Sequence, residues 1–381
     1  MKPEFNYFIV HVLLKIQFTE RMKHFVLLSL LLLTACAGEG GDPNRAILTQ
    51  ASYKDLPNWR NDKHAEAYKL FVDSCRVNDK LRSAYVTKAG NVIGDRSAWR
   101  NVCAMAYRFS NPTNDEAQQF FEANFTPYRI TTPASNKGRL TGYYEPLLRG
   151  SLKREGRYQT PVYAMPSGAT YPSRAQIEAG ALRGRAPILL YVDDPVMLFF
   201  LHIQGSGKVR LPDGRIVGIN YAGQNGHSYV AIGRVMKQEG LLEEITMQTI
   251  RDWLYANPRE AKRIMNTNPS YIFFKKSPGD QTAKGALGIP LTAGRSIAID
   301  DERSTYGVPI YIATISHDVR GNESPYQRLM IAQDTGGALI GAHRGDIFFG
   351  RGEFEEYQAG NQNALGKVFW LLPNRQAPHP Q

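Results

Sequence analysis

Residues 329–350 read LMIAQDTGGALIGAHRGDIFFG and hold two apolar runs, each of which meets an aspartate with glycine close by. The first run leads into Asp334, and Asp346 follows twelve residues later beside the second run. A third aspartate, Asp300, ends an apolar run at 296–299. A single aspartate at the end of a strand commonly makes only turn hydrogen bonds. Three of them in one block, beside glycines that let the backbone approach a ligand, make this block the candidate active site.

The segments around this block also read as short strands separated by glycine and proline. The runs with strand character are 139–144, 161–164, 188–192, 198–203, 209–211, 271–274, 296–299, 309–314, 328–332, 347–349 and 368–372. Helical periodicity is found at 65–72, 97–106, 114–121, 173–178, 228–237 and 246–265, with Pro258 restarting the last segment. Many short strands with glycine-rich corners favour small β-barrels over an open parallel sheet.

The composition is that of a folded protein with an anionic partner. The 381 residues are 43% hydrophobic and 21% charged, which excludes a disordered chain. Lysine and arginine outnumber aspartate and glutamate by 46 to 35, so nucleic acid, a membrane surface or an acidic polymer is the expected partner. The three cysteines are too few for a cysteine zinc site, and the eight histidines lack metal-binding spacings, so we expect no metal and no cofactor.

The N-terminus decides between these partners. Residues 22–36 read MKHFVLLSLLLLTAC: a basic head, an apolar run too short to span a bilayer, and small residues before Cys36. This pattern predicts a secretory signal over 1–35 that ends in a bacterial lipobox, with a lipid attached to Cys36. Residues 36–60 would then form a tether between the membrane and the folded domain. The alternative is an ordinary signal peptide that a cysteine follows by chance. Met22 is a better start than Met1, which makes 1–21 a candidate start-site artefact.

A location outside the cytoplasm excludes nucleic acid and favours a carboxylate-bearing envelope polymer such as peptidoglycan. The residue after Cys36 is Ala37 and not aspartate, which resembles sorting to the outer membrane of a Gram-negative bacterium. The protein is therefore expected on the periplasmic face of that membrane, held by the lipid on Cys36.

The two other cysteines, Cys75 and Cys103, form an even number in an oxidising compartment, which predicts a disulfide. The alternative is a pair of buried free thiols. A bridge that closes a loop of about 28 residues would stabilise the fold by roughly 3–4 kcal/mol.

Residues 138–146 read GRLTGYYEP and are a candidate binding segment. Thr141 offers a hydroxyl, and the aromatic pair Tyr143 and Tyr144 after a glycine suits stacking on sugar rings. The alternative is a pair of ordinary tyrosines on an edge strand.

Two more polar segments, 202–207 (HIQGSG) and 221–227 (YAGQNGH), could contribute to a site. The sequence after 207 does not read as a long helix, so a hydrogen-bonding rim for a polar ligand fits this corner better than a phosphate loop. His227 is expected to be a cap or turn residue, because no serine or cysteine nucleophile motif accompanies it.

These motifs together resemble the family of membrane-bound lytic murein transglycosylase A. The matching segments, in the family's order, are GYYEP at 142–146, HIQGSG at 202–207, YAGQNGH at 221–227, NPSY at 268–271 and the three-aspartate block. The resemblance covers the chain from about residue 55 to 373. None of the motifs is specific alone, but the set is specific for the family. The resemblance also agrees with the location in the cell envelope that the N-terminus predicts.

The resemblance implies a mainly β fold with peripheral helices. A double-psi β-barrel domain would be built from 61–144 and 271–375, with a smaller inserted β-barrel at 145–270 and a glycan groove between them. The implied partners are peptidoglycan glycan strands, the outer-membrane lipid on Cys36 and other cell-wall enzymes.

The implied activity is cleavage of the β-1,4 bond between N-acetylmuramic acid and N-acetylglucosamine, which leaves a 1,6-anhydro end. The family's essential aspartate corresponds to Asp346, with Asp334 and Asp300 as supporting residues. Substrate-binding positions are expected at Thr141, Gly142, Tyr143, Tyr144, Gln204, Gly205, Ser206 and Gly207. The block departs from the family's pattern in two places. Residues 304–307 read STYG in place of a proline-containing turn. The spacing of the last two aspartates is twelve, whereas some members have eleven.

A single carboxyl group can perform this reaction. Hydrolytic glycosidases typically need two carboxylates, whereas an internal nucleophile removes the need to place a water. The acid must be protonated at working pH, which requires a pKa raised by burial or by a neighbouring carboxylate such as Asp334.

Three other functions remain open from the residues alone. The Asp-Thr-Gly sequence at 334–336 mimics an aspartic protease, but a single copy would require a homodimer. A non-catalytic glycan-binding lipoprotein could use the same groove. A hydrolytic muramidase would need a second carboxylate opposite Asp346, spaced for a water.

Overall fold

The computed structural model describes residues 42–81, 84–168, 170–318 and 320–374. The predicted signal region and Cys36 lie outside these residues. All of the elements below belong to one compact unit, Asn44–Gln381. No helix in the described ranges is both long and apolar enough to cross a membrane.

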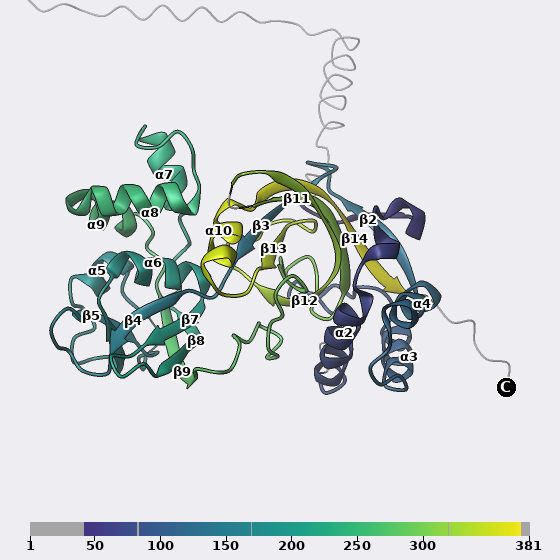
Figure 1. The fold of residues 1–381 in the computed structure, drawn as a ribbon, viewed down its shortest axis with the longest axis horizontal. Helices are drawn as coiled ribbons and strands as arrows, with labels where there is room; N and C mark the ends of the chain where they lie inside the picture. The colour runs from purple at the N-terminus through teal and green to yellow at the C-terminus, as the bar shows by residue number, and fades with distance from the viewer. Residues whose placement is uncertain (1–41, 82–83, 169, 319, 375–381) are drawn as a thin grey trace, which may run out of the picture. The chain divides into compact units, whose positions relative to one another are not determined.

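Six strands of the described chain close into a barrel (Figure 1). In spatial order they are β3 (Gly138–Tyr143), β14 (Asn363–Pro373), β11 (Pro309–His317), β12 (Glu323–Thr335), β10 (Ser296–Ile299) and β13 (Gly345–Phe348), and β13 returns to β3. Two of the pairings, β10 with β12 and β13 with β3, are parallel, and the others are antiparallel. The predicted mainly β fold with a closed barrel is thus confirmed, and its strands come from both sides of an insertion.

The long strand β14 closes the barrel and also extends it. Its first residues pair with β3, and its later residues pair with β2 (Phe125–Thr131), which in turn pairs with β1 (Ile47–Gln50). Gly366 of β14 has no room for a side chain, because a Cβ there would lie 2.7 Å from the carbonyl oxygen of Ala313 on β11. The absence of a side chain therefore allows three strands to meet at this point.

Three helices cover one side of the barrel: α2 (His64–Asn78), α3 (Arg96–Ala106) and α4 (Asn114–Asn124). Two single-turn 3-10 helices, Tyr53–Asp55 and Trp59–Asn61, precede them. The helices share one apolar core with the barrel strands, and this core includes the fully buried Trp99 and Phe121. A disulfide between Cys75 and Cys103 joins α2 to α3.

A second sheet of the described chain lies in the insertion. Its strands, in spatial order, are β5 (Thr160–Tyr163), β6 (Ile188–Val192), β4 (Leu147–Ser151), β7 (Ser206–Arg210), β8 (Ile216–Gln224) and β9 (Ile272–Pro278). A single parallel bridge between Ala164 and Phe274 joins the two edge strands. The sheet has its own apolar core around Val162, Leu190 and Val209, so the insertion contains a second β structure, as predicted.

Five helices accompany this sheet: α5 (Arg174–Glu178), α6 (Pro195–Gln204), α7 (Ile232–Gln238), α8 (Met247–Ala256) and α9 (Pro258–Asn266). Helices α6 to α9 share a separate apolar cluster that contains Phe199, Phe200, Met236 and Ile264. Ser173 caps α5 in the expected capping box, and Pro258 begins α9 as predicted.

The strand predicted at 198–203 is wrong, because this segment belongs to helix α6. The Asp194 carboxylate accepts hydrogen bonds from the backbone N–H groups of Val196 and Met197, and Pro195 occupies the first helical turn. These are strong helix-start signals. The apolar run looked like a strand because the helix is buried on nearly all sides. Helix α10 (Glu353–Asn361) and strands β1, β2, β4 and β8 were not predicted. Strand β1 lies within the predicted tether at 36–60, because its residues pair with β2.

Candidate active site

Strand β3 holds two carboxyl groups of the three-aspartate block through alternate residues. Thr141 and Tyr143 lie two positions apart, so their side chains share one face of the strand. The Thr141 hydroxyl donates to Oδ1 of Asp346, its direct partner on the parallel strand β13. The Tyr143 hydroxyl donates to Oδ2 of Asp334 at 2.9 Å. The structure therefore brings four of the predicted site residues together.

Asp334 is an aspartate with a raised pKa despite several hydrogen bonds. Its Oδ1 accepts from the backbone N–H groups of Ala286 and Thr335, each at 2.9 Å. Burial raises the pKa of Asp334 to about 6, although the three donors oppose the rise, and the negative charge of Asp346 adds to it. This carboxyl group is therefore held firmly and changes charge near neutral pH.

Burial also raises the pKa of Asp346, and the nearby Arg344 guanidinium opposes this rise. Arg344 is held in place by two carbonyl oxygens, since its Nη1 donates to Arg139 and Gly345 at 2.9 Å each. The Asp346 side chain nevertheless remains partly exposed. An acid with a raised pKa that solvent can still reach has the properties of a general acid.

Asp300 has a different environment. It is 4% exposed, and its Oδ2 accepts from the Gly341 backbone N–H at 2.7 Å and from Arg303 Nη1 at 2.8 Å. These bonds fix the turn after β10 and the segment that leads into β13. The structure places Asp300 as a residue that shapes the loop between the other two aspartates, and its bonds do not link it to either of them in the described chain.

Two of the predicted binding residues, Gly142 of β3 and Tyr144 directly after it, pack against other parts of the protein. A Cβ at Gly142 would lie 2.7 Å from the Phe349 ring and 2.9 Å from Cα of Ala359, so this glycine permits close packing of α10. Tyr144 is 2% exposed and cannot stack on a sugar in this structure. Its ring is buried beside Glu356, whose hydrogen bond and charge add to the burial that raises its pKa. Both residues thus contribute to the packing beneath the site.

The segment 204–207 connects the insertion to strand β3. Gln204 ends α6, and its Oε1 accepts from the Tyr144 backbone N–H at 3.0 Å. Gly205 terminates the helix with φ of 77°, a left-handed conformation that glycine adopts without strain. Ser206 begins β7 partly exposed, whereas Gly207 is buried, with the space for its Cβ only 2.8 Å from the Pro146 carbonyl oxygen. Ser206 is therefore the residue of this corner most able to contact a ligand.

Sequence reasoning missed two residues at this site. Arg344 was quoted beside Asp346 but was given no role. Tyr229 follows the 221–227 segment; burial of its hydroxyl raises its pKa, and the charge of Asp346 adds to this rise. His227 lies on the surface, with Nε2 3.2 Å from the Tyr171 carbonyl oxygen, as expected for a turn residue. No three histidine, cysteine or acidic side chains of the described residues gather as they would around a metal ion.

Two partly exposed carboxyl groups whose pKa values are raised by burial, and which accept hydrogen bonds from the Tyr143 and Thr141 hydroxyls, are typical of an enzyme of the general acid–base class. Comparison with known proteins then identifies the family. Residues 139–170 and 167–275 match the model of the MltA specific insert domain, and 295–372 match the 3D domain.

Named relatives and solved structures agree with these matches. Membrane-bound lytic murein transglycosylase A of Escherichia coli K12 is 36% identical over 248 residues, which are 63% of this chain and 67% of that protein. The Vibrio cholerae protein of the same name is 34% identical, over 62% of this chain and 66% of its own. The chain therefore belongs to the membrane-bound lytic murein transglycosylase A family.

Among solved structures, the membrane-bound lytic murein transglycosylase from Agrobacterium tumefaciens is 32% identical, with a TM-score of 0.74 over 86% of this chain and 97% of that chain. The Escherichia coli MltA structure with bound chitohexaose is 26% identical, with a TM-score of 0.65 over 87% of this chain and 95% of that chain.

Proposed function

We propose that this protein cleaves the β-1,4 bond between N-acetylmuramic acid and N-acetylglucosamine in peptidoglycan, with Asp346 as the single acid and then base. The observation that carries this proposal is the environment of Asp346: a partly exposed carboxyl group whose pKa is raised by burial. The chitohexaose bound to the Escherichia coli relative supports a glycan as ligand.

The proposed reaction has two proton transfers at one carboxyl group. Thr141 occupies Oδ1 of Asp346, so we assign the transferred proton to Oδ2. Protonated Asp346 donates to the leaving O4 of N-acetylglucosamine as the bond from C1 to O4 breaks. The resulting carboxylate accepts the proton of the muramic C6 hydroxyl while O6 bonds to C1, which gives the 1,6-anhydro ring without a water.

Asp334 and Arg344 have opposite effects on this acid. Arg344 stabilises the carboxylate that forms after proton donation, and so favours the donation step. The charges of Asp334 and Asp346 repel each other, so ionisation of both carboxyl groups together is disfavoured. Acid catalysis should fail as the pH rises through the pKa of Asp346, because the proton to be donated is then lost.

We also propose that the mature protein is an outer-membrane lipoprotein, anchored through Cys36 and facing the periplasm. The lipobox-like signal in the sequence and the words "membrane-bound" in the names of the relatives support this location. Peptidoglycan would then be the neighbouring polymer, and other cell-wall enzymes would be the expected protein partners.

The direct test is Asp346→Asn, which preserves size but cannot deliver a proton. Loss of a general acid usually lowers the rate about 10²–10⁴-fold, and we expect the upper end because the same group also acts as the base. The rate of cleavage of purified, peptide-free murein glycan is measured. The matched control is Asp318→Asn, since Asp318 caps an exposed turn with Asn322. An Asp346→Asn protein that cleaves near the wild-type rate would refute the assignment.

A further inference from the structure

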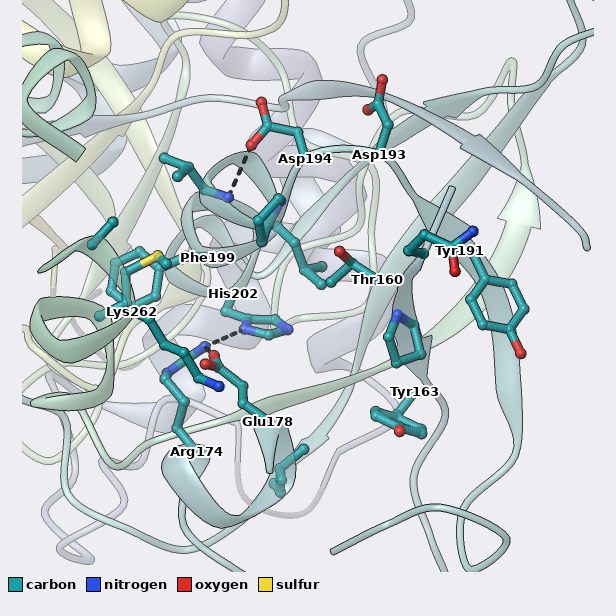
Figure 2. A pocket seen from close by; sticks show the side chains of 18 of the residues that line it. Thr160, Tyr163, Arg174, Glu178, Tyr191, Asp193, Asp194, Phe199, His202 and Lys262 are labelled. Atoms are coloured by element: carbon teal, nitrogen blue, oxygen red, sulfur yellow. Dashed lines mark hydrogen bonds and ion pairs between the residues drawn. The ribbon is translucent and has the colours of Figure 1, made fainter. Parts of the chain in front are cut away.

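A cavity of about 700 Å³ lies within the insertion, apart from the aspartates of the barrel (Figure 2). Strands β5 and β6 and helices α5, α6, α8 and α9 contribute to its walls. Its volume is within the range of pockets that hold small molecules, about 300–1,000 Å³. The proposed reaction uses none of the residues that line it.

A buried arginine forms the floor of this cavity. Arg174 is 1% exposed, and its guanidinium donates to the carbonyl oxygens of Asn268 at 3.1 Å and Ser270 at 2.7 Å. Its nearest carboxylate, on Glu178, is 3.6 Å away and belongs to a side chain that is 27% exposed. Burial lowers the pKa of Arg174. A buried positive charge with one partly solvated counter-ion gains from a further anion.

His202 leaves an unpartnered donor beside this arginine. Its Nδ1 lies 2.9 Å from Nη1 of Arg174. Because arginine can only donate, Nδ1 must be the acceptor, and the proton of the neutral imidazole is on Nε2. The ring is 6% exposed, and Nε2 has no hydrogen-bond partner among the described residues. In Figure 2 the ring end opposite Arg174 points toward the side of the cavity where Thr160 and Tyr163 lie.

The rim of the cavity carries an excess of positive charge. Five of the side chains that line the cavity are cationic and three are carboxylates. Of the carboxylates, Asp193 already pairs with Arg149 at 2.9 Å, and Asp194 accepts from the Tyr255 hydroxyl at 2.6 Å. Arg183 and Lys262 are exposed at the rim, and within the described chain neither forms an ion pair. The remaining charge therefore favours an anion.

The wall between the floor and the rim is partly apolar. Ile177, Phe199 and Leu254 are buried and line the cavity. The Phe199 ring also lies 4.7 Å from the guanidinium carbon of Arg174. A ligand that fits must therefore combine a carboxylate with an aliphatic portion, which is the chemistry of a short peptide.

We propose that this cavity binds a short peptide through a free carboxylate, with His202, Arg174, Arg183 and Lys262 as its recognition residues. This inference rests on the proposed function, because the peptide substituents of murein combine carboxylates with aliphatic side chains. The same chemistry has two sources: a peptide attached to the glycan being cut, or a free peptide released by cell-wall turnover.

The test measures binding of a free murein tripeptide, L-alanyl-γ-D-glutamyl-diaminopimelate, by calorimetry. Arg183→Glu and Lys262→Glu should each weaken binding about 5- to 30-fold, because each reverses a charge at the rim. Lys237→Glu, an equally exposed lysine on α7 of the insertion, is the control and should bind like wild type. All three variants should cleave peptide-free glycan at the wild-type rate, and the Nε2 nitrogen signal of His202 should shift when peptide is added.

Two arms separate the sources. If the peptide belongs to the substrate, Arg183→Glu and Lys262→Glu raise the KM for peptide-bearing murein only. If it is a free regulator, added tripeptide changes the rate on peptide-free glycan in the wild type and not in these variants. Absence of tripeptide binding, or equal binding by all the variants, would overturn the inference. Failure of the wild type to cleave peptide-free glycan would instead contradict the proposed function.

Discussion

Replacing Tyr143 by phenylalanine should raise the pKa of Asp334 further. The Tyr143 hydroxyl donates to Oδ2 of Asp334 at 2.9 Å and stabilises the ionised carboxylate. Burial already raises the pKa of Asp334 to about 6. A hydrogen bond to a charged group contributes about 1.5–3 kcal/mol, which corresponds to about one to two pKa units. In Tyr143→Phe the pKa of Asp334 is therefore expected between about 7 and 8.

The same substitution changes how stability depends on pH. The folded pKa of Asp334 lies above the unfolded value of 3.8, so the native state binds the proton more tightly. The contribution of Asp334 to the free energy of unfolding is therefore fully present at low pH. This contribution is lost as the pH rises toward the folded pKa of about 6. This loss is at most about 3 kcal/mol in the wild type. Tyr143→Phe should continue the loss to about pH 7–8.

Carbon-13 NMR of the aspartate carboxyl groups across a pH series measures the pKa directly. Urea denaturation at several pH values measures the free energy of unfolding. Tyr221→Phe is the control, because this tyrosine is 49% exposed. An Asp334 pKa in Tyr143→Phe that remains at about 6 would refute the role given to this hydrogen bond.

Three further sets of substitutions test other parts of the structure. Replacing Cys75 and Cys103 by alanine should lower the free energy of unfolding by roughly 3–4 kcal/mol, because the disulfide constrains the unfolded chain; an unchanged urea midpoint would contradict this. Cys36→Ser should release the protein from the membrane fraction with its intrinsic activity intact, and a variant that stays in that fraction as tightly as wild type would rule out the lipid anchor. Glu145→Ala should destabilise the fold by about 3–5 kcal/mol, because Lys208, 2% exposed and 3.2 Å from Glu145, would keep a buried charge without its counter-ion, with only the Gln281 carbonyl oxygen as acceptor. Changing Lys208 to methionine in the same protein should restore most of this loss, and a double variant as unstable as the single one would argue against a charge effect.

Elements with a clear pattern could be predicted from the sequence. The strands at 188–192 and 296–299 were predicted with the bounds of β6 and β10, because each is a short apolar run between turn residues. Periodicity could not decide the run at 198–203, since a buried helix and a buried strand are both continuously apolar. The Asp194–Pro195 start of α6 was the signal that would have decided it.

Residues in the site were predicted less completely than the strands. Asp346 and Thr141 lie 205 positions apart and meet only because β13 and β3 are parallel neighbours in the barrel. The environment of the Tyr144 hydroxyl includes Glu356 of α10, a helix that the sequence did not predict. The cavity of the insertion likewise depends on how four helices and a sheet assemble, and sequence motifs do not contain that information.

The chemical identity of the product tests the central proposal most directly. Peptide-free murein glycan is digested by the wild-type enzyme in water enriched in oxygen-18, and the masses of the muramic ends are measured by mass spectrometry. The internal attack by the C6 hydroxyl predicts anhydro ends about 18 mass units lighter than hydrolysed ends, without label from the solvent. Reducing muramic ends that carry oxygen-18 would show that water is the nucleophile, and would contradict the single-acid mechanism at Asp346.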